Sequence, residues 1–415
     1  MIKHLQELIA IPSVTCNQGG EKPFGDVVPQ ALTYVLNLCK SFGFRTKNCD
    51  GMIGYAEIGE GSDIVGILCH LDVVPAGNDW TYPPFKGEIH DGKIYGRGAI
   101  DDKGPAMAAI FAMKDILDAG IKLDKRVRII FGQTEEDGDW IDIDYYKEHE
   151  EIPTVGFTPD ADFPAIYGEK GIITLKVTMA LKDTGFEYIK GGNASNMVPD
   201  YAECTINGET ISKKGVSAHG STPWDGDNAI TSLMKKVVEL GVDSPLATFY
   251  MKKIGDNLYG EKIGIGLKDE QSGKLTFNVG TINTVGNNVE MEIDIRYPVT
   301  YSLEDVMLGI EPEIRDSIKC TIKVMDHMRP VYMDKDGEVI GRLLEAYREV
   351  TGDMTEPSVM GGGTYARGMD NIVAFGPVFP GRECTEHQKD EYAYVEDLEK
   401  ACEIYKKAII KLCKI

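Results

Sequence analysis

The alternation of helical and strand-like patterns constrains the fold of this chain more than any other feature. Apolar strand patterns at Asp63–His70, Arg126–Gln133 and Thr154–Asp160 alternate with helical patterns at Val27–Phe42 and Lys103–Gly120. Strands that alternate with helices are typical of a layered α/β architecture with a largely parallel sheet. We therefore predict an α/β fold in which helices cover both faces of a mixed, largely parallel sheet.

A different pattern interrupts this alternation between about residues 172 and 327. Strand patterns such as ITLKVTMAL, KLTFNVGTI and VEMEIDIRYP follow one another there, with helical patterns at Asn228–Gly241 and from Ser302 to about Asp316. The α/β pattern returns after about Val331 and ends in an amphipathic helix at Val395–Cys413. We predict a main α/β domain of residues 1–171 and 328–415, interrupted by an inserted α+β domain of residues 172–327.

Composition argues against several classes of function. The net charge of −22 over 415 residues would repel phosphate backbones, so nucleic acid is not an expected partner. The nine cysteines, an odd number without a C-x-x-C pair, argue against a disulfide framework or a zinc–thiolate site and suit reduced thiols. The N-terminus lacks signal-peptide features and no stretch is long and apolar enough to span a membrane, so we expect a cytoplasmic protein.

Two side chains at the end of a predicted strand are candidate metal ligands. His70 and Asp72 follow the apolar run DIVGILC, and residues i and i+2 of an extended backbone point to the same side. Open α/β sheets place their active sites at the carboxyl ends of their strands. Cys69 points the other way, which favours packing in the core.

Other carboxylates and a second histidine follow later elements. Asp101 and Asp102 stand where a loop enters a predicted helix, and one interpretation is that Asp102 only caps that helix. Two adjacent carboxylates allow one to cap and one to bind, so Asp101 is the better ligand candidate. A further cluster, Glu135-Glu136-Asp137, follows a strand pattern; such clusters are often only solvated surface, but this one ends an apolar strand as His70 does.

Two more candidates follow strand patterns: Asp160 ends TVGFTPD, and His387 comes shortly after NIVAFGPV. The resulting set combines two histidines with three carboxylates: His70, Asp101, Glu136, Asp160 and His387. Nitrogen and oxygen ligands without thiolates favour zinc, with manganese or cobalt as alternatives. These are more ligands than one catalytic zinc uses. We therefore predict two divalent ions that share one bridging carboxylate, with a bridging hydroxide as the nucleophile.

Seven segments of the chain carry a family resemblance. In order and spacing, GILCHLDVVPAG, YGRGAIDDKGP, GQTEED, TPDADFP, VSAHGSTP, GGGTYARGMDN and FPGRECTEHQ resemble the co-catalytic (two-metal) peptidase family. That family includes aminoacylases, acetylornithine deacetylases, succinyl-diaminopimelate desuccinylases, glutamate-releasing carboxypeptidases and dipeptidases. The chain is most similar to PepV-type dipeptidases, and the resemblance covers nearly its whole length.

The resemblance implies a role for each candidate residue of the metal site. His70 and Asp160 would bind one ion and Glu136 and His387 the other, while Asp101 would bridge the two ions. Asp72 would orient His70 and tune the site. Glu135 would be the general base that takes a proton from the attacking water and passes it to the leaving amine.

The resemblance also implies substrate contacts from the inserted domain, which would act as a lid similar to a dimerisation domain. His219 resembles a histidine that stabilises the oxyanion, although an isolated histidine is more often structural. Asn196 and Arg296 resemble substrate contacts, with Arg296 directed to the C-terminal carboxylate. Gly362, Gly363 and Thr364 resemble a loop that lines the pocket; the glycine cluster that includes the first two is not a phosphate loop, because no Gly-Lys-Ser/Thr follows it.

Members of the family that have an aspartate at the position of Asp160 resemble dipeptidases and aminopeptidases. Members that have a glutamate there resemble carboxypeptidases and deacylases. We therefore predict a metal-dependent dipeptidase that hydrolyses unblocked dipeptides, with an N-acyl amino acid deacylase or desuccinylase as the alternative. A third reading, a metal or peptide binder without activity, predicts a missing ligand or base. All of these residues are present, which argues against it.

The oligomeric state stays open between monomer and homodimer. NMVPDYAECTI resembles NTVGNNVEMEIDI within this chain, which is either chance or the trace of a duplicated lid. In PepV-type enzymes the lid resembles a doubled unit that allows a monomer. Here only a short stretch separates NMVPDYAECTI from VSAHG, so the first half of the lid is predicted to lack a helix.

Overall fold

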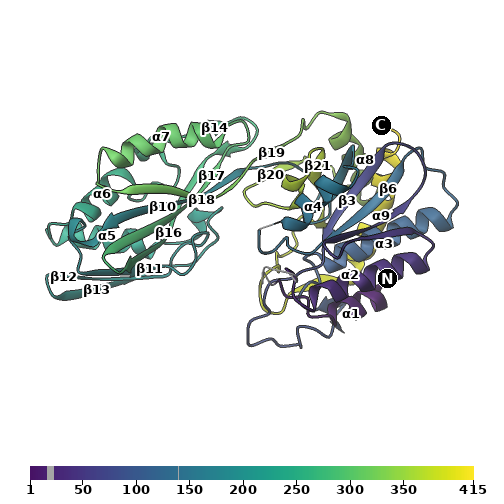
Figure 1. Ribbon diagram of the computed structural model, residues 1–415, viewed down its shortest axis with the longest axis horizontal. Helices are drawn as coiled ribbons and strands as arrows, with labels where there is room; N and C mark the ends of the chain where they lie inside the picture. Colours follow the sequence, from purple (N-terminus) through teal and green to yellow (C-terminus); the bar gives the residue numbers. More distant parts are fainter. Residues whose placement is uncertain (16–22, 139) are drawn as a thin grey trace. The chain divides into compact units, whose positions relative to one another are not determined.

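The computed structural model describes residues 1–15, 23–138 and 140–415 (Figure 1). The chain divides into two compact units. The first consists of Met1–Tyr167, Met333–Ser358 and Thr364–Ile415, and the second of Gly168–Tyr332 and Val359–Gly363. Of the nine cysteines, Cys16 lies outside the described residues, and the others are free thiols. No helix within the described residues has the length and apolar character needed to cross a membrane.

The first unit combines helices and strands from both ends of the chain. Its helices are α1 (Ile2–Ile9), α2 (Val28–Ser41), α3 (Lys103–Asp118), α4 (Ile141–His149), α8 (Glu338–Thr351), the 3₁₀ helix η4 (Tyr365–Gly368) and α9 (Val395–Leu412). Its strands are β1 (Arg45–Cys49), β2 (Ile53–Ile58), β3 (Ile64–His70), β4 (Glu88–His90), β5 (Lys93–Tyr95), β6 (Arg126–Gly132), β7 (Val155–Thr158), β8 (Ala161–Asp162), β21 (Ile372–Ala374), β22 (Pro377–Val378) and β23 (Tyr392–Tyr394). Strands β9 (Ile166–Glu169) and β20 (Ser358–Met360) have residues in both units.

A parallel core dominates the main sheet of this unit. Along the sheet the strands run β1-β2-β6-β3-β7-β21-β9, and the four central strands from β6 to β21 are parallel to one another. The pairs β1–β2, β2–β6 and β21–β9 are antiparallel. All seven residues of β3 are buried, as expected for a parallel strand covered on both faces. The predicted mixed, largely parallel α/β sheet is therefore confirmed.

Helices cover both faces of this sheet, and β2 shows why. Neighbouring residues of a strand point to opposite faces. At Gly54 an added Cβ would meet Leu32 of α2 at 2.8 Å. The next residue, Tyr55, contacts the ring of Tyr146 in α4. Helices α2 and α4 therefore lie on opposite faces of the sheet.

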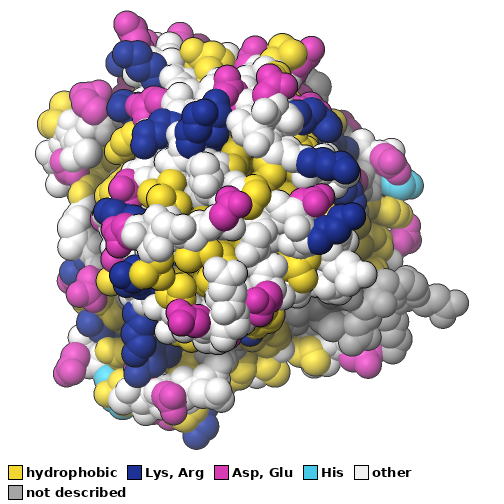
Figure 2. Space-filling view, turned by 90° about the vertical axis from the view of Figure 1, so that its left-hand side faces the viewer, with side chains coloured by type: hydrophobic (Ala, Val, Ile, Leu, Met, Phe, Trp, Pro, Cys, Tyr) yellow, Lys and Arg dark blue, Asp and Glu magenta, His cyan; other side chains and the backbone are white. Residues whose placement is uncertain are grey.

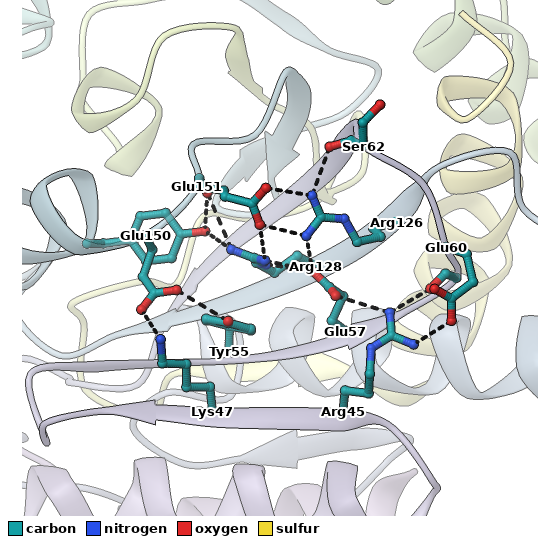
Figure 3. Close-up of polar contacts among 12 residues, drawn as sticks. Arg45, Lys47, Tyr55, Glu57, Glu60, Ser62, Arg126, Arg128, Glu150 and Glu151 are labelled. Carbon is teal, nitrogen blue, oxygen red and sulfur yellow. Dashed lines mark hydrogen bonds and ion pairs between the residues drawn. The ribbon is translucent and has the colours of Figure 1, made fainter.

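A charged network lies on β1, β2 and β6 (Figure 3) and is centred on Glu57. Glu57 accepts hydrogen bonds from Arg128 Nε at 2.8 Å and Arg45 Nη2 at 3.1 Å, and Arg126 Nη1 lies 3.7 Å from its Oε2. Glu151 accepts two further bonds from Arg126, at 2.7 and 2.8 Å. Because Arg128 is buried, these carboxylates satisfy a guanidinium that would otherwise be costly to bury. The network stands at the amino end of β6.

The second unit is built on one antiparallel sheet. Its helices are η1 (Leu181–Asp183), η2 (Pro223–Asp225), α5 (Ala229–Glu239), α6 (Pro245–Lys253), η3 (Glu261–Ile263) and α7 (Leu303–Arg315). Its strands are β10 (Gly171–Ala180), β11 (Tyr188–Gly191), β12 (Tyr201–Ile206), β13 (Glu209–Lys214), β14 (Lys268–Asp269), β15 (Gly273–Lys274), β16 (Thr276–Val285), β17 (Asn288–Tyr297), β18 (Thr321–Met328) and β19 (Val331–Tyr332). The sheet order is β13-β12-β11-β16-β17-β10-β18.

The hydrophobic core of this unit lies between one face of the sheet and helices α5, α6 and α7. On β10 the buried residues Ile173, Leu175 and Val177 alternate with partly exposed ones, which is the pattern of a sheet with one covered face.

On the face of the molecule seen in Figure 2, basic and acidic side chains are interspersed among apolar ones. The excess of acidic residues is therefore not gathered into one patch on that face.

Candidate metal centre

Three parallel strands deliver candidate ligands to one edge of the main sheet. His70 is the last residue of β3, Glu135 and Glu136 follow β6, and Asp160 follows β7. Because β6, β3 and β7 are parallel, their carboxyl ends lie at the same edge. Two groups of side chains there have ligand atoms within 4.8 Å of one another: His70, Asp101 and Glu136, and His70, Glu135 and Asp160.

Asp101 lies between the two candidate histidines. Its Oδ1 is 2.9 Å from Nε2 of His70, and its Oδ2 is 3.1 Å from Nε2 of His387. Nε2 of His70 also lies 3.8 Å from Oδ2 of Asp160, and Nε2 of His387 lies 2.9 Å from Oε2 of Glu136. One carboxylate thus faces a histidine–aspartate pair with one oxygen and a histidine–glutamate pair with the other.

The hydrogen bonds of His70 leave one of its ring nitrogens for a cation. Its Nδ1 lies 2.9 Å from the backbone oxygen of Asp72 and donates to it, so in the neutral ring, the form that binds metal, the lone pair is on Nε2. That Nε2 is buried and has no hydrogen-bond partner among the described residues, although Asp101 Oδ1 is close to it. Oε1 of Glu136 is likewise buried without a hydrogen-bond partner among the described residues. Orphaned buried acceptors that face one another fit divalent metal ions, whose ligands are imidazole nitrogens and carboxylate oxygens.

The electrostatics of the cluster also favour a bound cation. Burial, and then the negative charge of Asp101, raises the pKa of Glu136 to about 7 and that of Asp160 to about 6. Burial alone would lower the pKa of His387, but Asp101 and Glu136 raise it to about 11. Without a metal the carboxylates thus either carry protons or pair with protonated imidazoles. A divalent ion would displace these protons.

Asp72 is buried directly beneath this cluster. Its two carboxylate oxygens accept the backbone N–H groups of Glu135 at 3.2 Å and Glu136 at 3.1 Å. Its backbone oxygen accepts the His70 ring N–H, while its own Oδ1 is 3.5 Å from that nitrogen. Asp72 therefore joins the end of β3 to the loop after β6.

The interpretation that Asp102 caps the following helix is wrong for its side chain. Asp102 occupies the N-cap position of α3, but its side chain makes no capping hydrogen bond. Instead, its Oδ2 accepts the backbone N–H of His70 at 3.2 Å. Asp102 thus supports His70, the candidate ligand at the end of β3, and not its own helix.

Two further buried carboxylates shape the ligand loops, and sequence reasoning missed both. Glu391 accepts the N–H groups of Gly98, Ile100 and Asp101 at 3.0, 3.1 and 3.4 Å, and forms an ion pair with Arg97 at 2.6 Å. It thereby ties the segment that carries His387 to the loop that carries Asp101. No local pattern predicts this role, because the partners are 290 or more positions away in the sequence.

Asp142 does the same for the loop after β6. It accepts hydrogen bonds from the N–H of Gln133 at 2.5 Å, from Thr134 Oγ1 at 2.9 Å and from the hydroxyl of Tyr365 at 2.7 Å. An aspartate in the first turn of a helix, as Asp142 is in α4, is ordinarily explained by the helix dipole alone. Because the helix dipole already explains Asp142, the sequence gives no reason to expect its contacts with the loop that carries Glu135.

Glu135 stands beside the candidate ligands without contacting either histidine as closely as Glu136 does. Its carboxylate belongs to the group with His70 and Asp160. Burial, and then the negative charge of Asp160, raises the pKa of Glu135 well above its usual range. Its backbone oxygen accepts the indole N–H of Trp140 at 3.1 Å.

The candidate substrate contacts other than Thr364 belong to the second unit. Asn196 and His219 are exposed and lie on facing segments, because Met197 and His219 form a β-bridge and the N–H of Gly220 donates to the oxygen of Asn196 at 2.7 Å. Arg296 is nearly buried, and its Nη1 donates to the oxygen of Gly361 at 3.2 Å.

Gly362 and Gly363 follow in the same loop and are partly exposed. Thr364, in the first unit, is the N-cap of η4: its hydroxyl accepts the N–H of Ala366 at 3.1 Å. The structure thus gives Thr364 a structural role at the start of η4, whatever else it contacts.

Comparison with curated proteins gives relatives over the full length of the chain. "Putative dipeptidase YtjP" of Bacillus subtilis (strain 168) is 38% identical over 455 aligned residues, which cover 100% of this chain and 97% of the relative. "Putative dipeptidase" of Staphylococcus epidermidis is 36% identical, with the same coverage.

Solved structures share the fold at lower identity. The carboxypeptidase Sso-CP2 of Sulfolobus solfataricus superposes with a TM-score of 0.65 at 18% identity, covering 100% of this chain and 99% of that one. Human carnosine dipeptidase 1 gives 0.63 at 16% identity, with 100% and 96% coverage. The Bacillus subtilis protein YxeP, described as a dinuclear metal-binding peptidase, gives 0.57 at 11% identity, with 100% and 97% coverage.

A family model matches residues 66–411, a range that includes every candidate ligand. Together with the full-length relatives, this match confirms the resemblance seen in the sequence. The chain belongs to peptidase family M20/M25/M40.

Proposed function

We propose that the protein is a dinuclear metal-dependent dipeptidase that hydrolyses the peptide bond of unblocked dipeptides. The observation that carries the proposal is the position of Asp101, whose two oxygens face two different histidines at 2.9 and 3.1 Å. The Bacillus and Staphylococcus relatives carry the name "putative dipeptidase", which supports this substrate class.

In this proposal each ion has three protein ligands. His70 and Asp160 would hold one, Glu136 and His387 would hold the other, and Asp101 would serve both. The donor set suits zinc first, with manganese or cobalt as alternatives. When bound, such ions supply Lewis acidity that activates water and polarises a carbonyl group.

Glu135 is the proposed general base and acid. It would take the proton of the attacking water and deliver it to the leaving amine. Its raised pKa supports this role, because a carboxylate that titrates nearer to neutral pH returns the proton more readily. Asp72 would keep Glu135 and Glu136 in place through their backbone N–H groups.

On the second unit, which we propose as a lid, His219 would donate to the developing oxyanion and Asn196 would contact the substrate. Arg296 would bind the C-terminal carboxylate, and Gly362 and Gly363, with Thr364, would line the pocket. The exposure of Asn196 and His219 on a hairpin whose backbone is hydrogen-bonded supports their availability to a ligand. A cytoplasmic location and a monomeric or homodimeric state stay predictions.

A substrate panel tests the proposal. Metal-free protein is reconstituted with zinc, manganese or cobalt and offered unblocked dipeptides and N-acyl amino acids. We expect hydrolysis of the dipeptides, loss of activity with a chelator and recovery when metal is restored. Cleavage of N-acyl amino acids alone would replace the proposal with the deacylase alternative, and no metal-dependent cleavage of either class would overturn both.

A further inference from the structure

A pair of buried polar residues interrupts the sheet of the second unit. Asn278 on β16 and Asp294 on β17 lie directly opposite each other in the strand register. Their neighbours Phe277, Ile293 and Ile295 belong to the hydrophobic core, so the pair points to the other face of the sheet. Asn278 is 2% exposed and Asp294 is 1% exposed. A buried carboxylate needs hydrogen-bond or ion-pair partners, and the partner of Asp294 is one of the proposed substrate contacts.

The partner of Asp294 is the guanidinium of Arg296, two residues along on the same face. Nε of Arg296 donates to Oδ1 of Asp294 at 2.6 Å and Nη2 donates to Oδ2 at 2.7 Å, which is a bidentate pair. Nη1 donates to the oxygen of Gly361 at 3.2 Å. A guanidinium has about five N–H donors. With three of them engaged, two are left on a group whose plane Asp294 fixes.

Asn278 supports the other substrate contacts proposed in this unit. Its Nδ2 donates to the oxygen of Met197 at 2.9 Å, and its Oδ1 accepts from Asn228 at 3.1 Å. Met197 is next to Asn196 in the chain and forms the β-bridge with His219. The Asn278–Asp294 pair therefore holds the Asn196–His219 hairpin with one member and Arg296 with the other.

The space around Asp294 leaves little freedom for this arrangement to shift. An added Cβ at Gly220, the residue after His219, would lie 3.2 Å from Oδ2 of Asp294 and 2.8 Å from the backbone oxygen of Asn196. At Gly361 an added Cβ would lie 2.9 Å from Ser221. The hairpin thus packs against the carboxylate of Asp294, and the glycine loop packs against the hairpin and Arg296.

We propose that Asp294 is a positioning residue that orients Arg296 towards the substrate carboxylate and so sets the preference for a free C-terminus. The inference rests on the proposed function in one respect, namely that Arg296 meets that carboxylate. A fixed guanidinium plane presents its remaining N–H groups in the geometry that a carboxylate matches, whereas a rotating guanidinium does not. The selectivity of Arg296 therefore depends on Asp294.

The test compares KM for a dipeptide with KM for the same dipeptide amidated at its C-terminus. In the zinc-reconstituted wild-type enzyme we expect a lower KM for the free acid. Asp294→Asn should raise KM for the acid about 10- to 100-fold, the range for hydrogen bonds to a charged group, with little change in kcat or in KM for the amide. Asp294→Glu keeps the charge pair but moves the guanidinium, so we expect an intermediate loss; it decides the question if Asp294→Asn does not fold.

Glu292→Gln is the matched control. Glu292 lies two residues before Asp294 on the same face of β17, but it is more exposed and pairs with Lys176 at 3.1 Å. This variant should keep the wild-type ratio of the two KM values. A merely structural role for Asp294 would impair acid and amide alike, and that result would overturn the inference, as would a wild-type enzyme without a preference for the acid.

The design separates this inference from the proposed function. If the wild-type enzyme hydrolyses only N-acyl amino acids, the dipeptidase proposal fails. The same comparison with an N-acyl amino acid and its amide then still decides the role of Asp294, because both substrate classes carry a free carboxylate. If neither class is hydrolysed, both proposals are overturned.

Discussion

Adjacent glutamates at the end of β6 have different environments, although the sequence makes them look equivalent. The carboxylate of Glu136 lies 2.9 Å from His387, whereas that of Glu135 groups with His70 and Asp160. Both backbone N–H groups donate to Asp72, so the two side chains leave a fixed piece of backbone in different directions. In the proposed mechanism this division would let Glu136 bind metal while Glu135 moves a proton.

Replacing each glutamate by glutamine separates the two roles. Glu135→Gln should lower kcat about 10²- to 10⁴-fold, the usual contribution of a general base, while the protein keeps its full metal content. Glu136→Gln should lower the metal content itself, because a ligand is lost. Turnover and metal analysis on the same samples check both expectations. An unchanged kcat in Glu135→Gln would exclude it as the base.

At this scale the sequence predicts which residue types gather, but not which atoms they use. The i, i+2 spacing of His70 and Asp72 and the position of Glu135–Glu136 after an apolar strand are visible in the sequence. That Asp72 receives two backbone N–H groups, and that Asp102 supports His70 and not its own helix, depends on loops that meet only in the folded chain. Spacing along one strand cannot show such contacts.

Glu391 connects two elements that are distant in the sequence. It stands just before β23 and accepts the N–H groups of the loop that leads to α3. Asp101 lies at the end of that loop, and His387 lies in the segment before Glu391. The distance between these two candidate ligands is thus set through a residue that is not itself a candidate ligand.

Glu391→Gln should therefore weaken metal binding without removing a ligand. We expect an affinity about 10- to 100-fold lower, the usual cost of losing a residue that orients a ligand. Competition with a chromophoric chelator measures it, and the absorption spectrum of the cobalt-substituted protein reports any change in ligand geometry. The control is Glu383→Gln, because Glu383 is an exposed glutamate in the same segment that accepts a hydrogen bond from the hydroxyl of Tyr392. Equal affinities in the two variants would contradict the role assigned to Glu391.

Among the elements, long apolar or strongly periodic segments could be predicted and short or irregular ones could not. The predicted strand at Asp63–His70 corresponds to β3, and the predicted helix at Val27–Phe42 to α2. Helix α6 was not predicted, although Ser244 caps it and Pro245 opens it, which is a recognisable start signal. Strand β13 has no buried residue, so hydrophobic periodicity could not reveal it.

For the whole molecule, all five candidate ligands lie in the first unit, so metal binding should stabilise that unit. A ligand that binds only the folded state adds about 2.7 kcal/mol when its concentration is one hundred times Kd. We expect chelation to lower Tm and to increase hydrogen exchange in the first unit only. Hydrogen exchange measured by mass spectrometry checks this, with a matched sample whose metal is restored. Loss of protection spread evenly over both units would contradict it.

The carboxylates beneath the ligands have a consequence for how this activity is inherited. Asp72, Asp142 and Glu391 shape the ligand loops through backbone N–H groups, and none of these bonds needs an ion. A descendant that exchanged His70 or Asp101 for an inert residue would keep the same loops and the same fold. Mutations that abolish catalysis would therefore leave the backbone unchanged. In distant relatives, the presence of the candidate ligands, and not the fold, would distinguish an active enzyme from an inactive one.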